Sequence, residues 1–196
     1  MNFLAHCALA GADGDLIVGS FLGDFVKGPV ATTLPTNVQR GVRLHRRIDA
    51  YSNVQADIRT SVARFPRELR RIAPVFVDLI ADHFLARDFE RHHGEALADF
   101  SARTYEALDA GARWLTDDAA SFRRFVEDSD MFARYRRIET VTRGFRRVAE
   151  RLGMTATVEP AVAAFRARYE EFGADFERYY PDIRMHAEEW LADSSR

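Results

Sequence analysis

Apolar residues recur at spacings of three and four along most of this sequence, and that period constrains the fold more than any other feature. No stretch of useful length alternates apolar and polar residues in the way that a strand would. We therefore predict an all-α fold, a single-domain helical bundle, with a kink near Pro181 in its last helix. The predicted helices cover residues 2–10, 16–26, 36–63, 74–87, 94–111, 118–129, 138–152 and 159–192.

The composition excludes several classes of protein. Hydrophobic residues make up 47% and charged residues 30% of the chain, which are values typical of globular domains. The net charge of -2 gives no sign of a nucleic-acid binder. Cys7 is the only cysteine, so an internal disulfide framework and a thiolate-rich zinc site are both excluded. The sequence lacks an 18-residue apolar run and a basic, signal-like start, and we expect a cytoplasmic protein without a membrane span.

The dipeptide Asp82-His83 lies within the predicted helix 74–87, on or beside the face that should enter the core. Burial of a carboxylate is costly unless the group is paired, hydrogen-bonded or bound to a metal. The rest of the first half repeats this pattern. His6 lies among apolar residues, Asp24 follows a glycine in an apolar segment, and His45 and Asp49 share the inward stripe of the helix 36–63.

Two interpretations of these six inward polar residues stay open on spacing alone. Imidazole and carboxylate groups are ligands for Mn, Fe, Zn or Mg, and a metal would explain how so many carboxylates tolerate burial. The alternative is a hydrogen-bonded network that only fixes the packing of helices. We expect His92-His93 and His186 to lie at a helix end and on the surface, outside this set.

Four segments of the first 90 residues resemble the acyl carrier protein phosphodiesterase family, which is related to the HD metal-dependent phosphohydrolases. They are Met1–His6, Gly23–Gly28, Gly41–Asp49 and Asp82–Ala86. The resemblance implies an HD-like helical hydrolase, typically supported by manganese, that cleaves 4′-phosphopantetheine from the serine of holo-acyl carrier protein. Because all six inward polar residues precede Phe84, we expect residues 1–90 to carry the site and helices in 94–192 to form its wall or lid.

Site residues follow from the same resemblance. Its motifs imply Asp24, His45, Asp82 and His83 as metal ligands, and Asp24, Asp82 and His83 as catalytic groups. They imply His6 and Asp49 as additional ligands or as groups that orient the ligands.

Arginines are concentrated between Val38 and Ile72, where nine stand against three acidic residues. The carrier that the resemblance implies is an acidic protein, so a basic face beside the site would steer and orient it. We therefore expect a docking face at Arg43, Arg46, Arg47 and Arg70, although a solvated helix face or a polyphosphate site would show the same pattern. Two other functions stay open, an HD-type hydrolase of a nucleotide or other small phosphoester and a non-catalytic helical binding module.

Overall fold

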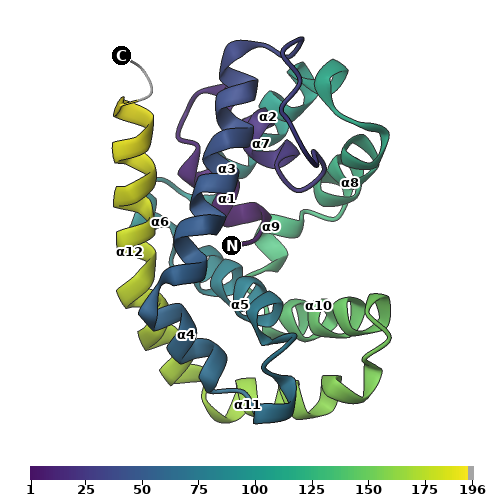
Figure 1. Ribbon diagram of the computed structural model, residues 1–196, viewed down its shortest axis with the longest axis vertical. Coiled ribbons are helices and arrows are strands. Elements are labelled where there is room, and N and C mark those ends of the chain that lie inside the picture. The colour runs from purple at the N-terminus through teal and green to yellow at the C-terminus, as the bar shows by residue number, and fades with distance from the viewer. Residues whose placement is uncertain (194–196) are drawn as a thin grey trace.

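The computed structural model describes residues 1–193, which form helices joined by short loops, with no strand among them (Figure 1). The all-α prediction is confirmed. Three short 3₁₀ helices lie at Arg67–Leu69, Ala112–Trp114 and Thr155–Thr157. The α-helices are α1 (Phe3–Leu9), α2 (Gly14–Leu22), α3 (Thr36–Val54), α4 (Ala56–Ala63), α5 (Ala73–Arg87), α6 (Phe89–His93), α7 (Leu97–Ala110), α8 (Asp117–Asp128), α9 (Met131–Arg134), α10 (Ile138–Arg151), α11 (Val158–Ala167) and α12 (Tyr169–Asp193).

Two of the predicted helices are divided in the structure. The segment 36–63 is broken at Gln55, whose extended backbone (φ -65°, ψ 128°) ends α3 and begins α4. The segment 159–192 is broken at Arg168, where φ of -123° leaves the helical region between α11 and α12. Neither break has a proline or glycine at that position, so no strong local signal in the sequence marks it.

Helix α2 packs closely against α3, the helix that carries His45 and Asp49. A Cβ atom added to Gly19 of α2 would lie 2.0 Å from the carbonyl oxygen of Val38 in α3. A residue with a side chain would therefore push the two backbones apart, which explains a glycine inside a helix despite its cost of about 1 kcal/mol. This contact fixes α3 beside the end of α2.

Helix α1 and the amino terminus lie in the middle of the molecule, with α12 on one side and α8 and α10 on the other (Figure 1). All residues of α1 from Leu4 to Leu9 are buried. The buried aromatic side chains that fill the core come mainly from the second half of the chain and include Phe100, Phe145, Phe165 and Phe176. Among residues 1–193, no helix combines the length and the apolar character that crossing a membrane requires.

Candidate active site

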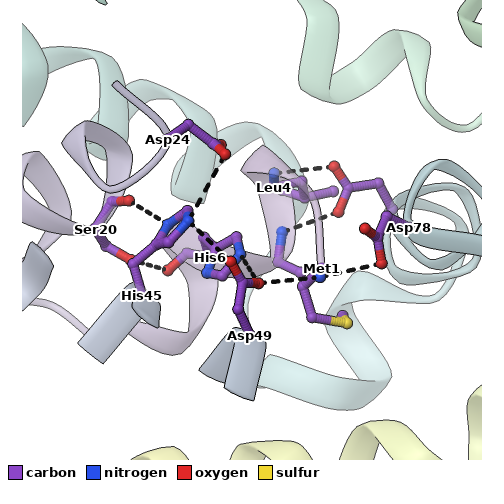
Figure 2. Close-up of polar contacts among 10 residues, drawn as sticks. Met1, Leu4, His6, Ser20, Asp24, His45, Asp49 and Asp78 are labelled. Atoms are coloured by element: carbon purple, nitrogen blue, oxygen red, sulfur yellow. Dashed lines mark hydrogen bonds and ion pairs between the residues drawn. The ribbon is translucent and has the colours of Figure 1, made fainter. Parts of the chain in front are cut away.

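His6 of α1 and His45 and Asp49 of α3 form a cluster of possible metal ligands (Figure 2). One nitrogen or oxygen from each lies within 4.8 Å of the others, and the described residues contain no second group of this kind. His6 Nε2 lies 3.1 Å from Asp49 Oδ1, and His45 Nε2 lies 3.3 Å from Asp49 Oδ2. The two imidazole rings stack, with their centroids 3.6 Å apart.

The hydrogen bonds of His45 define which of its nitrogens is available. Nδ1 lies 2.8 Å from the carbonyl oxygen of Ser20, which can only accept, so Nδ1 carries the hydrogen and donates it. Nε2 then points toward Asp49, 3.3 Å from its Oδ2, and toward Asp24, whose Oδ1 is 3.7 Å away. A proton or a cation between Nε2 and these carboxylates stabilises the arrangement. Two imidazoles and a carboxylate are a set of ligand atoms that fits a divalent metal.

The end of α2 sets the positions of both histidines. A Cβ atom on Gly23 would lie 2.1 Å from Cγ of His45, so the ring occupies the space that a side chain would take. The Ser20 hydroxyl donates a hydrogen bond of 2.9 Å to the carbonyl oxygen of His6. Ser20 thus contacts His45 through its carbonyl and α1 through its side chain.

Burial and neighbouring charges shift the pKa values of these groups in different directions. Burial, with a contribution from the neighbouring His45, lowers the pKa of His6 to about 3, and its Nδ1 has no hydrogen-bond partner. Burial alone would raise the pKa of Asp49, but its contacts with His45 and His6 outweigh burial and hold that pKa far below its usual value. Burial raises the pKa of Asp24. At neutral pH the cluster therefore combines a neutral His6 with an ionised Asp49, and Asp24 is a stronger base than an exposed aspartate.

A third carboxylate, Asp78 of α5, lies across from Asp49. The amino group of Met1 lies between them, 3.1 Å from Asp78 Oδ1 and 3.4 Å from Asp49 Oδ1. Burial lowers the pKa of this amino group, but Asp78 and Asp49 outweigh burial and bring the pKa to about 10. A cation is therefore stabilised at this position between the two carboxylates.

Asp82 has a different environment. Its two carboxylate oxygens accept hydrogen bonds from the backbone N–H groups of Leu4 (3.0 Å) and Ala5 (3.1 Å), in the first turn of α1. Burial raises the pKa of Asp82 to about 7, and the two N–H donors act in the opposite direction. Such N–H groups have no partner within their own helix, so Asp82 satisfies them and holds α1 against α5.

His83 also has both polar atoms occupied by partners away from the cluster. Its Nδ1 donates to the carbonyl oxygen of Tyr135 (2.7 Å), and its Nε2 accepts from the hydroxyl of Tyr169 (2.7 Å). Burial lowers the pKa of His83, which favours this neutral form. The predicted convergence of Asp82 and His83 with Asp24 and His45 is therefore not found.

A cleft of about 750 Å³ opens over the carboxylates of the cluster. Its floor includes Asp24, Asp49 and Asp78, and Lys27, the only lysine of the chain, lies on its edge. Its lining comes from both halves of the chain, and the second half contributes aromatic residues of α8 and arginines of α9 and α10. These wall residues are Phe122, Phe125, Arg134, Arg143, Arg147 and Arg151.

Comparison with known proteins agrees with this combination of motifs and fold. The family model for acyl carrier protein phosphodiesterase matches residues 1–183. This chain belongs to the acyl carrier protein phosphodiesterase family. Proteins of that name from Salmonella dublin and Shigella boydii serotype 4 are 32% and 30% identical to it over 193 and 192 residues, covering 95% of this chain and 97% of each relative. No solved structure matches it.

As a member of the acyl carrier protein phosphodiesterase family, the chain is an enzyme.

The arginines predicted to dock its partner have other contacts. Arg43 donates to Gln39, Arg46 to the carbonyl oxygen of Val26 and Arg47 to His186, while Arg70 is exposed. Within residues 1–193, none of these four arginines lines the cleft.

Sequence reasoning missed Asp78 and the arginines of α10. Asp78 lies one turn before Asp82 on α5, so the same spacing that singled out Asp82 would have found it.

The later histidines lie outside the cluster. His93 precedes Gly94, which adopts the left-handed conformation (φ 70°) at the end of α6, as expected, whereas His92 is buried rather than exposed. His186 stacks on Tyr51 and accepts a hydrogen bond from Arg47.

Proposed function

We propose that this enzyme is a metal-dependent phosphodiesterase that releases 4′-phosphopantetheine from the serine of holo-acyl carrier protein, leaving the apo form. One observation carries the proposal beyond the family name. His6 and His45 converge on the carboxylate of Asp49, with His45 Nε2 3.3 Å from Asp49 Oδ2, and this carboxylate lines a cleft. Such a set of ligand atoms beside a cleft is typical of a divalent-cation site. A cytoplasmic location, expected from the single cysteine, is part of the same proposal.

We offer His6, His45 and Asp49 as the metal ligands, and Asp24 as the next nearest donor. Two imidazoles and a carboxylate suit Mn²⁺, the metal expected from the family, and also Fe²⁺ or Zn²⁺. When bound, a divalent cation supplies polarisation of the phosphoryl group and a more acidic water. Asp82 and His83 remain in the proposal only as positioning residues, because their polar atoms already have partners in the structure.

The side chains around the cluster have their own tasks in hydrolysis. Asp24 faces the cleft, and its raised pKa makes it the best-placed group to accept a proton from the attacking water. Ser20 holds the tautomer of His45, and so the direction of its lone pair. Phe25 and Phe122 on the cleft wall limit the access of bulk water to the floor.

The test uses protein freed of metal with EDTA and holo-acyl carrier protein as substrate. Added Mn²⁺ should restore conversion of the holo to the apo form, followed by intact mass, and elemental analysis should find the metal bound. Asp49→Asn should abolish both cleavage of the carrier and metal binding. Asp57→Asn, which changes a surface carboxylate paired with Arg178, should leave both unchanged. Hydrolysis of nucleotides without cleavage of the carrier, in Mn²⁺ or Mg²⁺, would support the small-phosphoester alternative instead. Absence of bound metal would favour the binding module.

A further inference from the structure

Helix α10 carries three arginines spaced four residues apart, Arg143, Arg147 and Arg151. A rise of about 1.5 Å per residue places them on one stripe that spans about 12 Å. All three are exposed and line the cleft, and Arg134 of α9 lines it as well. We call Arg143, Arg147 and Arg151 the arginine ladder.

The guanidinium groups of the ladder are available to a partner. Within residues 1–193, no carboxylate forms an ion pair with Arg134 or with any arginine of the ladder. Elsewhere in the fold, Arg64 and Arg103 have close carboxylate partners. The one fixed member is Arg147, whose guanidinium lies over the ring of Phe125 in α8, 5.1 Å from its centroid. The ladder therefore concentrates positive charge on the cleft wall without ion pairs to carboxylates of the described residues.

The ladder runs from the catalytic floor to the edge of the molecule. Gly144, beside Arg143, packs on Leu79, and a Cβ atom there would lie 3.0 Å from Leu79 Cδ1. Leu79 follows Asp78 of the floor directly in α5. From this contact α10 extends outward, on the same side of the molecule as α8 (Figure 1). A molecule bound along the ladder therefore has one end near the carboxylates.

The amount of charge distinguishes between possible ligands. A phosphodiester carries one negative charge, and the ladder with Arg134 offers four positive ones. A stripe of arginines at helical spacing instead matches carboxylates repeated every three or four residues along an acidic helix. Phe125, 39% exposed beside Arg147, adds the aromatic and arginine contacts that are enriched at the centres of protein interfaces.

We propose that the arginine ladder and Phe125 form the surface on which the acidic carrier protein docks. This inference rests on the proposed function, and it places the docking surface on α8 and α10 instead of at Arg43, Arg46, Arg47 and Arg70. Docking there would direct the phosphopantetheine arm along the cleft toward Asp24 and Asp49.

The test compares charge reversals on different faces. Arg143→Glu and Arg151→Glu change exposed ladder residues that have no ion pair. Arg166→Glu makes the same change of charge on α11, outside the cleft, and Arg70→Glu tests the surface first predicted from the sequence. Each variant is assayed with Mn²⁺ on holo-acyl carrier protein and on bis(4-nitrophenyl) phosphate. Binding of apo-acyl carrier protein is measured separately by fluorescence anisotropy.

Each ladder variant should lower kcat/KM on the carrier about tenfold more than on the small phosphodiester, mostly through KM, and weaken anisotropy binding about tenfold. The loss should shrink as salt rises, since the Debye length falls from about 10 Å at 0.1 M to about 3 Å at 1 M. Arg166→Glu and Arg70→Glu should change both values less than about twofold.

Two outcomes would overturn the inference while leaving the proposed function intact. In one, the wild type cleaves the carrier but the ladder variants bind the apo-carrier normally. In the other, the ladder variants lose the same factor on both substrates, which would indicate that the arginines hold the phosphodiester itself. If the wild type neither cleaves holo-carrier nor binds apo-carrier, both the proposed function and the proposed docking surface are wrong.

Discussion

Two sets of aspartate and histidine lie close together in this enzyme and have opposite surroundings. In the first set, His6, His45 and Asp49, both rings lie against one half-exposed carboxylate that borders a cleft, and Nδ1 of His6 has no hydrogen-bond partner. In the second, Asp82 and His83, every polar side-chain atom has a hydrogen-bond partner within the fold. The residue types are the same in both sets.

The difference shows how a buried polar residue can be classified. A group whose donors and acceptors are all matched stabilises the packing of elements, and it has no bonding capacity left for a ligand. A group with an unmatched polar atom, or with a carboxylate open to a cleft, keeps bonding capacity for a ligand. By that criterion, the first set is the candidate metal site, and the second set positions α1 and α5 around it.

Asp49→Asn should have the largest effect. The substitution keeps the shape of the side chain and removes its charge, so we expect kcat/KM on holo-acyl carrier protein to fall about a thousandfold, or about 4 kcal/mol in transition-state free energy. Circular dichroism should show an unchanged fold. Retention of more than a tenth of the activity would remove Asp49 from the metal site and weaken the contrast between the sets.

Asp82→Ala should affect stability first. The N–H groups of Leu4 and Ala5 would lose their acceptors, and we expect the free energy of unfolding to fall by about 3 kcal/mol, at about 1–3 kcal/mol for each buried unpaired group. Asp82→Asn keeps one acceptor oxygen, so its free energy of unfolding should fall less. Denaturant titration measures both losses. An unchanged stability together with lost Mn²⁺ binding would mean that Asp82 is a ligand after all.

Metal should stabilise the protein only through the first set. At a free Mn²⁺ concentration of 100 times Kd, the free energy of unfolding should rise by about 2.7 kcal/mol. His83→Gln should retain this increase and His45→Ala should lose it, because His45 belongs to the ligand cluster and both ring nitrogens of His83 are hydrogen-bonded elsewhere. Thermal melts with and without EDTA would report it. Equal increases in both variants would contradict the assignment.

The effect that is smallest at neutral pH concerns a property that the two sets share. Burial lowers the pKa of His6 to about 3 and also lowers that of His83, so both are neutral when folded. In the unfolded chain a histidine binds a proton below about pH 6.5. The unfolded state then holds more protons than the folded state, so each histidine should lower stability by up to about 1.4 kcal/mol per pH unit as pH falls from 6.5.

His6→Gln and His83→Gln, each in EDTA, should therefore flatten the loss of stability between pH 6.5 and 4. For His6 the loss should level off near pH 3, where the folded ring also protonates. Urea titrations at several pH values give the slopes. A slope equal to that of the wild type in His6→Gln would mean that His6 is charged in the fold.

Much of this architecture could be predicted from local sequence. Helix α5 begins one residue before its predicted start and ends where expected, and the spacing of His45 and Asp49 correctly placed both on one side of α3. The environment of Asp82 could not be predicted, since its donors lie 78 and 77 residues away at the start of α1. The spacing of apolar residues indicates that a residue is buried. Which group satisfies its polar atoms depends on which helices pack together, and the spacing does not indicate that.

The solitary lysine of this chain makes the enzyme convenient for labelling. Lys27 is exposed on the edge of the cleft, and the α-amino group of Met1 is buried between two carboxylates. A succinimidyl ester should therefore attach one fluorophore at the cleft without any engineered cysteine. Changes in its emission would report in real time when a partner arrives and when it leaves.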